Sequence, residues 1–282
     1  MGDFYADNMN IREINGFTLQ QTARDVWAID EFGIDIMYLV IGSKRALLID
    51  TGIGLGNVRA VVETMTDLPY DVVNTHHHYD HVGGNGHFDQ VYVHKKAIPV
   101  IREQNTAKMR EEFFISQEKR TEYNHRASLW YDMKPLGSCK MKELQGGDCF
   151  YLGDRVLEVI ETPGHTRDGI CLLDKENRLL FSGDTIVSTP TLMFDTFSDT
   201  MSVYLKSLEA LRDRGGEYEL IFPGHYLRPI GKIYLDHMIK CVKEILEGCV
   251  PGEAEENGMT RQPVYLHRKG LASVMYTEDR IG

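Results

Sequence analysis

The chain has 282 residues, of which 42% are hydrophobic, so it can bury a sizeable core as one large domain or two small ones. Its formal net charge of −11 repels phosphate backbones and argues against nucleic acid as a partner. The five cysteines are odd in number and never spaced as C-x-x-C, which argues against a disulfide framework and a zinc ribbon.

No signal for export or membrane insertion is visible in the sequence. Residues 1–10 are acidic and polar rather than basic and then apolar, as a signal peptide would be. The longest apolar stretch, residues 36–41, is far too short to cross a bilayer. We therefore expect a cytoplasmic protein that does not associate with membranes.

The first third of the chain predicts an antiparallel meander followed by a layered α/β unit. Short strand-like runs occupy residues 17–21, 26–29, 36–41 and 46–49. Residues 57–65 carry valines at helical spacing and predict a helix. The β-branched pair Val72 and Val73 then predicts a strand that leads into a cluster of histidines.

The remaining elements repeat this order of strands and then helices. Residues 95 to about 134 interleave charged and apolar side chains and predict a helical insertion with two helices. Predicted strands follow at 150–152, 156–160, 170–173, 179–181 and 220–222, and predicted helices at 201–212 and 232–246. We expect one α/β (α+β) domain over residues 1–282, with two sheets packed face to face, outer helices, and a C-terminal helix plus tail at about 232–282.

The strongest chemical signal is the string THHHYDH at residues 75–81, which contains the pattern H-x-H-x-D-H. His76 and His78 lie two residues apart, so their imidazoles point to one side of an extended segment. Asp80 and His81 follow after the chain turns and can face a neighbouring point. The pattern therefore predicts two adjacent metal positions.

Three further metal-binding side chains follow predicted strands. His165 lies in a Thr-Pro-Gly-His turn, Asp184 follows a glycine at a strand end, and His225 follows a second Pro-Gly pair. The strands at 170–173 and 179–181 form a predicted hairpin, which returns Asp184 to the edge where His165 begins. Five imidazoles and two carboxylates suit zinc, iron or manganese better than calcium or magnesium.

With these motifs, residues 17–230 resemble the metallo-β-lactamase superfamily. The resemblance implies a four-layer αβ/βα sandwich of two mixed β-sheets with outer helices. It also implies a ligand set: for the first metal His76, His78 and His165, for the second Asp80, His81 and His225, and as the bridging carboxylate Asp184. Asp50, in the turn DTG, resembles the residue that orients a ligand histidine in this family.

The strings THHHYDHVGGN, TPGHT and SGDT are most similar to those of glyoxalase II, other thioesterase-like members and lactonases. We therefore expect a binuclear hydrolase that uses a metal-bound hydroxide on a small ester, thioester or lactone, with two zinc ions, or iron or manganese in their place. Asp80 is the candidate catalytic residue that orients the water and shuttles its proton. Tyr79, Phe194 and Tyr226 are candidates for substrate contact.

Two other activities in the same superfamily remain open at this point. The first is an iron-dependent oxidoreductase of the persulfide dioxygenase kind, against which the full set of seven ligands argues. The second is a phosphodiesterase, against which the acidic charge argues. The amphipathic segment 232–246 is a candidate interface for a homo-oligomer.

Overall fold

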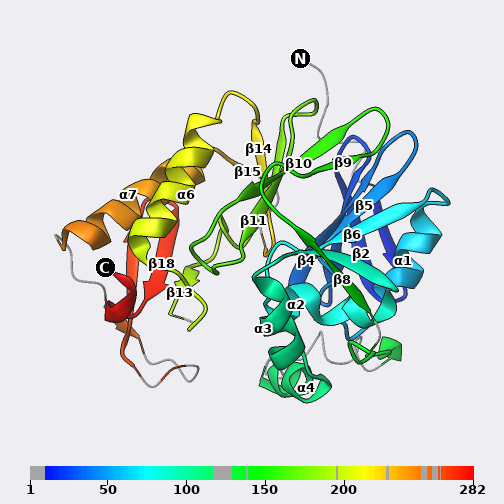
Figure 1. Ribbon diagram of the computed structural model, residues 1–282, viewed down its shortest axis with the longest axis horizontal. Coiled ribbons are helices and arrows are strands. Elements are labelled where there is room, and N and C mark those ends of the chain that lie inside the picture. Colours follow the sequence, from blue (N-terminus) through cyan, green and yellow to red (C-terminus); the bar gives the residue numbers. More distant parts are fainter. Residues whose placement is uncertain are drawn as a thin grey trace. The chain divides into compact units, whose positions relative to one another are not determined.

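The structure, a computed structural model, describes residues 10–116, 129–137, 139–194, 196–226, 229–248, 253–255, 260 and 262–282 (Figure 1). The chain forms two compact units, each with its own core. Unit 1 contains Met1–Leu144 and Phe150–Arg155, and unit 2 contains Gln145–Cys149 and Val156–Gly282. The assignment of all 282 residues to one domain stays a prediction.

Unit 1 is built on an eight-stranded sheet whose strands follow one another in chain order. The first five strands pair antiparallel, and the pairs from β5 to β8 are parallel. The predicted meander is therefore confirmed. The strands are β1 (Ile11–Ile14), β2 (Phe17–Ala23), β3 (Val26–Glu31), β4 (Asp35–Ile41), β5 (Ala46–Ile49), β6 (Tyr70–Val73), β7 (Gln90–His94) and β8 (Lys140–Leu144).

Helices α1 (Val58–Met65) and α3 (Ala97–Gln104) cover one face of this sheet. The Asn57 side chain begins α1 by accepting a hydrogen bond from the Ala60 amide at 3.0 Å. The buried valines of α1 and Ala97 and Ile101 of α3 share one apolar cluster with alternate residues of the strands. Because side chains alternate across a strand, this cluster identifies one face of the sheet. The chain also forms α2 (Tyr79–Val82) and the short helix η1 (Gly83–His87).

The predicted helical insertion contains α3 and α4 (Ala107–Ser116). Arg110 of α4 is fully buried and donates to the carbonyl oxygens of Ile53, Gly83 and Lys134 at 2.6–3.3 Å. A buried guanidinium needs such partners, and here they attach α4 to two loops and to the start of η1 in unit 1. Residues 117–128, including Tyr123, lie outside the described part of the chain.

Unit 2 contains a second mixed sheet. Its strand order is β15-β14-β12-β11-β10-β9. The boundary between the units falls within the edge strand β9 (Cys149–Tyr151). β11 and β12 form the predicted hairpin, and β14 runs parallel to β12. The strands of unit 2 in this sheet are β10 (Val156–Glu161), β11 (Ile170–Asp174), β12 (Leu179–Gly183), β14 (Leu220–Pro223) and β15 (Ile230–Gly231).

A third, four-stranded sheet accompanies two helices in unit 2. Its order is β13 (Thr191–Met193), β18 (Ala272–Tyr276), β17 (Val264–Lys269) and β16 (Glu253–Glu255), and η2 (Glu278–Arg280) follows β18. α6 (Met201–Asp213) and α7 (Ile233–Glu247) lie side by side (Figure 1). Three of the strands fall in the segment that the sequence analysis treated as a tail.

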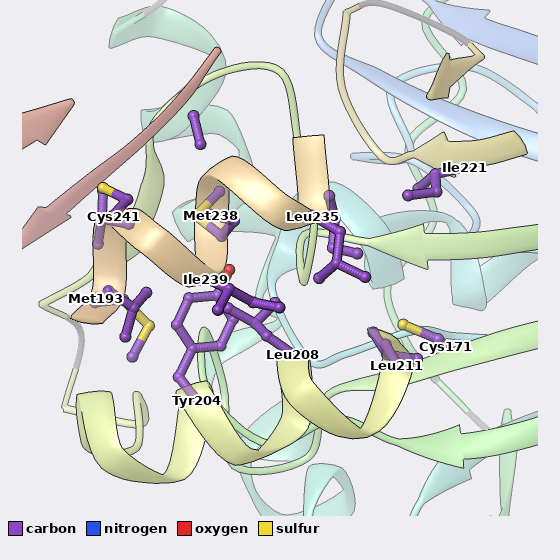
Figure 2. Close-up of a cluster of buried hydrophobic side chains, with 14 of the residues drawn as sticks. Cys171, Met193, Tyr204, Leu208, Leu211, Ile221, Leu235, Met238, Ile239 and Cys241 are labelled. Carbon is purple, nitrogen blue, oxygen red and sulfur yellow. The ribbon is translucent and has the colours of Figure 1, made fainter. Parts of the chain in front are cut away.

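The core of unit 2 joins these helices to the small sheet and to strands β11, β12 and β14 of the larger one. Figure 2 shows Tyr204 and Leu208 of α6 near Met238 and Ile239 of α7, and Met193 of β13 belongs to the same cluster. The apolar face of α7 is thus used inside unit 2, and a homo-oligomer built on it stays a prediction. Among the described helices, none is both long and apolar enough to span a membrane.

Candidate metal centre

Asp50 follows β5 directly and organises the histidine cluster of unit 1. Its carboxylate accepts hydrogen bonds from the Thr75 amide at 2.7 Å, the Thr75 hydroxyl at 2.8 Å and His81 Nδ1 at 2.9 Å. Asp50 is buried and has a φ of 64°, a left-handed conformation that is costly for a residue with a Cβ atom. Its contacts hold this strained turn in place, and its role in orienting a ligand histidine stays a prediction.

These hydrogen bonds determine which ring nitrogen carries the proton. An ionised carboxylate only accepts, so the single Thr75 hydroxyl proton points to Asp50. The hydroxyl oxygen must then accept from His76 Nδ1, 3.1 Å away. His81 likewise donates through Nδ1 to Asp50. Nε2 of both rings therefore keeps its lone pair for a metal ion.

The spacing of the nitrogen atoms in unit 1 fits a bound ion. His76 Nε2 and His78 Nδ1 lie 3.1 Å apart. With metal–nitrogen bonds of about 2.0–2.1 Å, this separation corresponds to an angle of roughly 100° at the ion, close to a tetrahedral one. The ligand atoms of His76 and His81, and those of Asp80 and His81, also lie within 4.8 Å of each other. The donor set and its geometry thus suit a metal such as zinc.

A buried carboxyl pair supports the loop that follows Asp50. Glu31 and Asp35 face each other across the β3–β4 hairpin. Glu31 accepts from the amides of Gly56 at 2.9 Å and Gly54 at 3.1 Å. Burial raises the pKa of Glu31 to about 7, and burial together with the charge of Glu31 raises the pKa of Asp35 well above its usual value. The pair therefore favours a shared proton over two charges.

Asp35→Asn is expected to increase stability more at pH 8 than at pH 5. Both carboxyl groups have a higher pKa in the folded chain than in the unfolded one, so the stability that their protonated forms contribute is complete below about pH 4 and is lost as the pH rises. An amide in place of Asp35 stays neutral at every pH, so it should recover about 1–3 kcal/mol of this loss at pH 8. The free energy of unfolding in urea at both pH values measures this effect. Equal changes at pH 5 and pH 8 would contradict it, and the exposed Asp67→Asn serves as the control.

The three predicted ligands of unit 2 converge at the ends of its strands. Asp184 Oδ2 lies 3.2 Å from His225 Nε2 and 3.7 Å from His165 Nε2. The β11–β12 hairpin returns Asp184 to the start of the His165 loop, and β14, parallel to β12, ends just before His225. The Gly224 amide donates to the Gly183 carbonyl at 2.9 Å and joins the last two loops. The sequence-based prediction that a hairpin brings His165 and Asp184 together is confirmed.

The protonation of His165 also suits a metal. Its Nδ1 donates to the Leu192 carbonyl oxygen at 2.7 Å, because a carbonyl oxygen only accepts. Nε2 of neutral His165 therefore carries a lone pair, and it faces an oxygen of Asp184 that is also an acceptor. Two such acceptors are stabilised by a cation that both can bind. This half of the donor set also fits a metal ion.

The candidate substrate contacts have different surroundings. Tyr79 packs partly buried against the small cluster of Phe32, Ile53 and Leu55. Phe194 is half-buried. Tyr226 is 48% exposed and has a φ of 56°, a strained conformation directly after His225. Their role in substrate contact stays a prediction. The sequence analysis missed Thr75 and the Leu192 carbonyl, because a hydroxyl and a backbone oxygen carry no motif of their own.

Comparison with known proteins identifies the family of this chain. A family model described as the metallo-beta-lactamase superfamily matches residues 33–225. The chain belongs to this superfamily. Two solved superfamily proteins share its fold. A metallo-β-lactamase from Erythrobacter litoralis matches with a TM-score of 0.59 and 17% identity, over 83% of this chain and 100% of that one. A metallo-β-lactamase family protein from Thermus thermophilus matches with a TM-score of 0.57 and 19% identity, over 82% of this chain and 85% of that one. The predicted fold class is confirmed.

Several curated relatives carry the names of hydrolases. The acyl-coenzyme A thioesterase MBLAC2 of Gallus gallus is 33% identical over 205 residues, 67% of this chain and 72% of the relative, and that of Homo sapiens is 32% identical with the same coverage. The cytoplasmic hydroxyacylglutathione hydrolase of Saccharomyces cerevisiae is 26% identical over 202 residues, 68% of this chain and 64% of the relative. The chain is a metal-dependent hydrolase, as predicted. Its cytoplasmic location stays a prediction.

Proposed function

We propose that this hydrolase cleaves acyl thioesters with two divalent metal ions, zinc first among them. The observation that carries the proposal is the arrangement of lone pairs: hydrogen bonds fix the Nδ1 proton of His76, His81 and His165 and leave each Nε2 available. The names of the relatives support thioesters over simple esters and lactones.

The seven ligands are proposed with the division that the superfamily motifs imply. Each group combines residues that lie far apart in the sequence. The first ion would be held by His76, His78 and His165, the second by Asp80, His81 and His225, and both by Asp184. The 3.1 Å separation of nitrogens in the first group and the 3.2 Å and 3.7 Å separations around Asp184 support this division.

When bound, the two ions would lower the pKa of a water molecule towards about 7 and would act as a Lewis acid on the thioester carbonyl. The residues of the chain do the rest. The carboxylate of Asp80 would orient the attacking water and hold its proton until the thiolate leaves. Asp50 and Thr75 keep the histidine rings in the orientation that this geometry requires. Tyr79, Phe194 and Tyr226 remain our candidates for contact with the acyl chain or its carrier.

A substrate panel tests the proposal. Zinc-loaded protein should hydrolyse an acyl-coenzyme A, an S-acylglutathione or both, and the two thioesters separate the thiol carriers. A lactone and an aryl phosphodiester should react at least about tenfold more slowly in kcat/KM, because the site would be complementary to a tetrahedral transition state with a thiolate leaving group. Cleavage of the lactone or phosphodiester without thioester hydrolysis would contradict the substrate class. Sulfur-dependent oxygen uptake by an iron form would favour the persulfide dioxygenase alternative.

A further inference from the structure

The small sheet of unit 2 contacts the loop that carries His165. β13 is an edge strand, and among the described strands of this sheet it pairs with β18 alone, with Leu192 opposite Met275. The Leu192 carbonyl accepts the Nδ1 proton of His165 at 2.7 Å. The position of this oxygen therefore depends on the pairing of β13 with β18, a strand outside the residues that the superfamily model matches.

A second contact holds the backbone of the same loop. The fully buried Ser198 donates its hydroxyl to the His165 carbonyl at 2.8 Å. The Asp199 amide donates to the Gly164 carbonyl at 2.8 Å, and the Arg167 amide donates to the Phe197 carbonyl at 3.0 Å. The segment 197–199 is thus bonded to the chain before, at and after His165.

Arg280 fixes that segment from η2. Its Nη1 donates to the Ser198 carbonyl at 3.3 Å, and its Nη2 lies 3.2 Å from the Asp279 carboxylate. The Arg280 side chain is only 16% exposed, so water competes weakly for its donors. Arg280, Ser198 and His165 therefore form a continuous series of hydrogen bonds.

We propose that β18 and Arg280 are positioning elements for His165, which hold its imidazole in one orientation and one tautomer. The inference rests on the proposed role of His165 as a metal ligand. It assigns to residues 272–280, outside the matched superfamily region, a role in the chemistry of the site. Helix α6 also holds this loop, since Ser207 donates to the Pro163 carbonyl at 2.7 Å. Loss of Arg280 should therefore loosen His165 without unfolding unit 2.

Zinc affinity, measured by chelator competition, tests the proposal in the full chain. Arg280→Ala should weaken the binding of one of the two zinc ions by about tenfold or more. Loss of a group that supports a ligand histidine usually lowers metal affinity by this much. Arg280→Lys, which keeps one donor for the Ser198 carbonyl, should restore most of the affinity. Arg268→Ala, which alters an exposed arginine on β17, is the matched control and should leave the affinity unchanged.

Imidazole nitrogen shifts of the metal-free protein give a readout that a purely structural role would not move. In Arg280→Ala, His165 should change from one tautomer to a mixture. Unchanged imidazole shifts and unchanged zinc affinity in Arg280→Ala would overturn the inference. So would an equal loss of zinc affinity in Arg280→Ala and Arg280→Lys that is proportional to their loss of unfolding free energy. His165→Ala separates the two proposals: if it binds two ions as tightly as the unaltered chain, the ligand assignment itself has failed.

Discussion

Asp184→Asn is expected to remove bound metal and thioester hydrolysis together. Asp184 Oδ2 is within 3.7 Å of the Nε2 atoms of both His165 and His225, so this carboxylate lies next to both predicted ligands of unit 2. An amide has almost the same shape, but it lacks the negative charge that a bridge between two cations needs. We expect fewer than two ions per chain and a fall in kcat/KM of more than about 10³-fold, because water is no longer activated at neutral pH.

Metal content by elemental analysis and steady-state kinetics of the same preparation check this result. Asp213→Asn, an exposed carboxylate at the end of α6, should change neither quantity. Retention of two ions with full activity in Asp184→Asn would remove the bridging carboxylate from the account.

Asp50→Asn should have the second largest effect on metal binding. It should act by changing which ring nitrogen of the histidines carries the proton. The new amide group faces His81 Nδ1 and the Thr75 hydroxyl, and it donates where the carboxylate accepted. His81 then accepts through Nδ1 and carries its proton on Nε2, where it blocks the metal. The reversed hydroxyl of Thr75 should impose the same change on His76. We expect metal affinity to fall by about 10–100-fold or more.

The tautomers can be measured directly from imidazole nitrogen shifts of the metal-free protein. Asp71→Asn, which alters a partly exposed carboxylate paired with Arg45 in the same unit, is the matched control and should leave the shifts and the affinity unchanged. Wild-type shifts and affinity in Asp50→Asn would show that the carboxylate does not set the tautomers.

Local sequence signals were sufficient for much of the fold and of the donor set. The pattern H-x-H-x-D-H and the two Pro-Gly-His turns identify side chains whose chemistry is specific. The turn between β11 and β12 correctly predicted that Asp184 returns to His165. The helices α1, α6 and α7 were predicted because each buries residues at helical spacing.

Other elements have no local signal. β1 and β8 are edge strands of their sheet with mostly exposed side chains, so they lack the apolar alternation that marks a strand. β18 pairs with β13, about 80 residues earlier in the chain, and both β17 and β18 pack against α7. The groups that hydrogen-bond to the His165 loop also have no sequence signal, because Leu192 contributes a backbone oxygen and Arg280 acts through Ser198. Long-range pairing of this kind is visible only in the structure.

Stepwise reloading of metal-depleted protein with zinc, with acyl-thioester hydrolysis measured at each step, shows whether catalysis needs two ions. Activity should remain low at one equivalent and rise to its maximum at two equivalents, and elemental analysis of the active protein should give two ions per chain. Full thioesterase activity with one ion per chain, or no thioester hydrolysis with two ions bound, would contradict the proposal of a two-ion thioesterase.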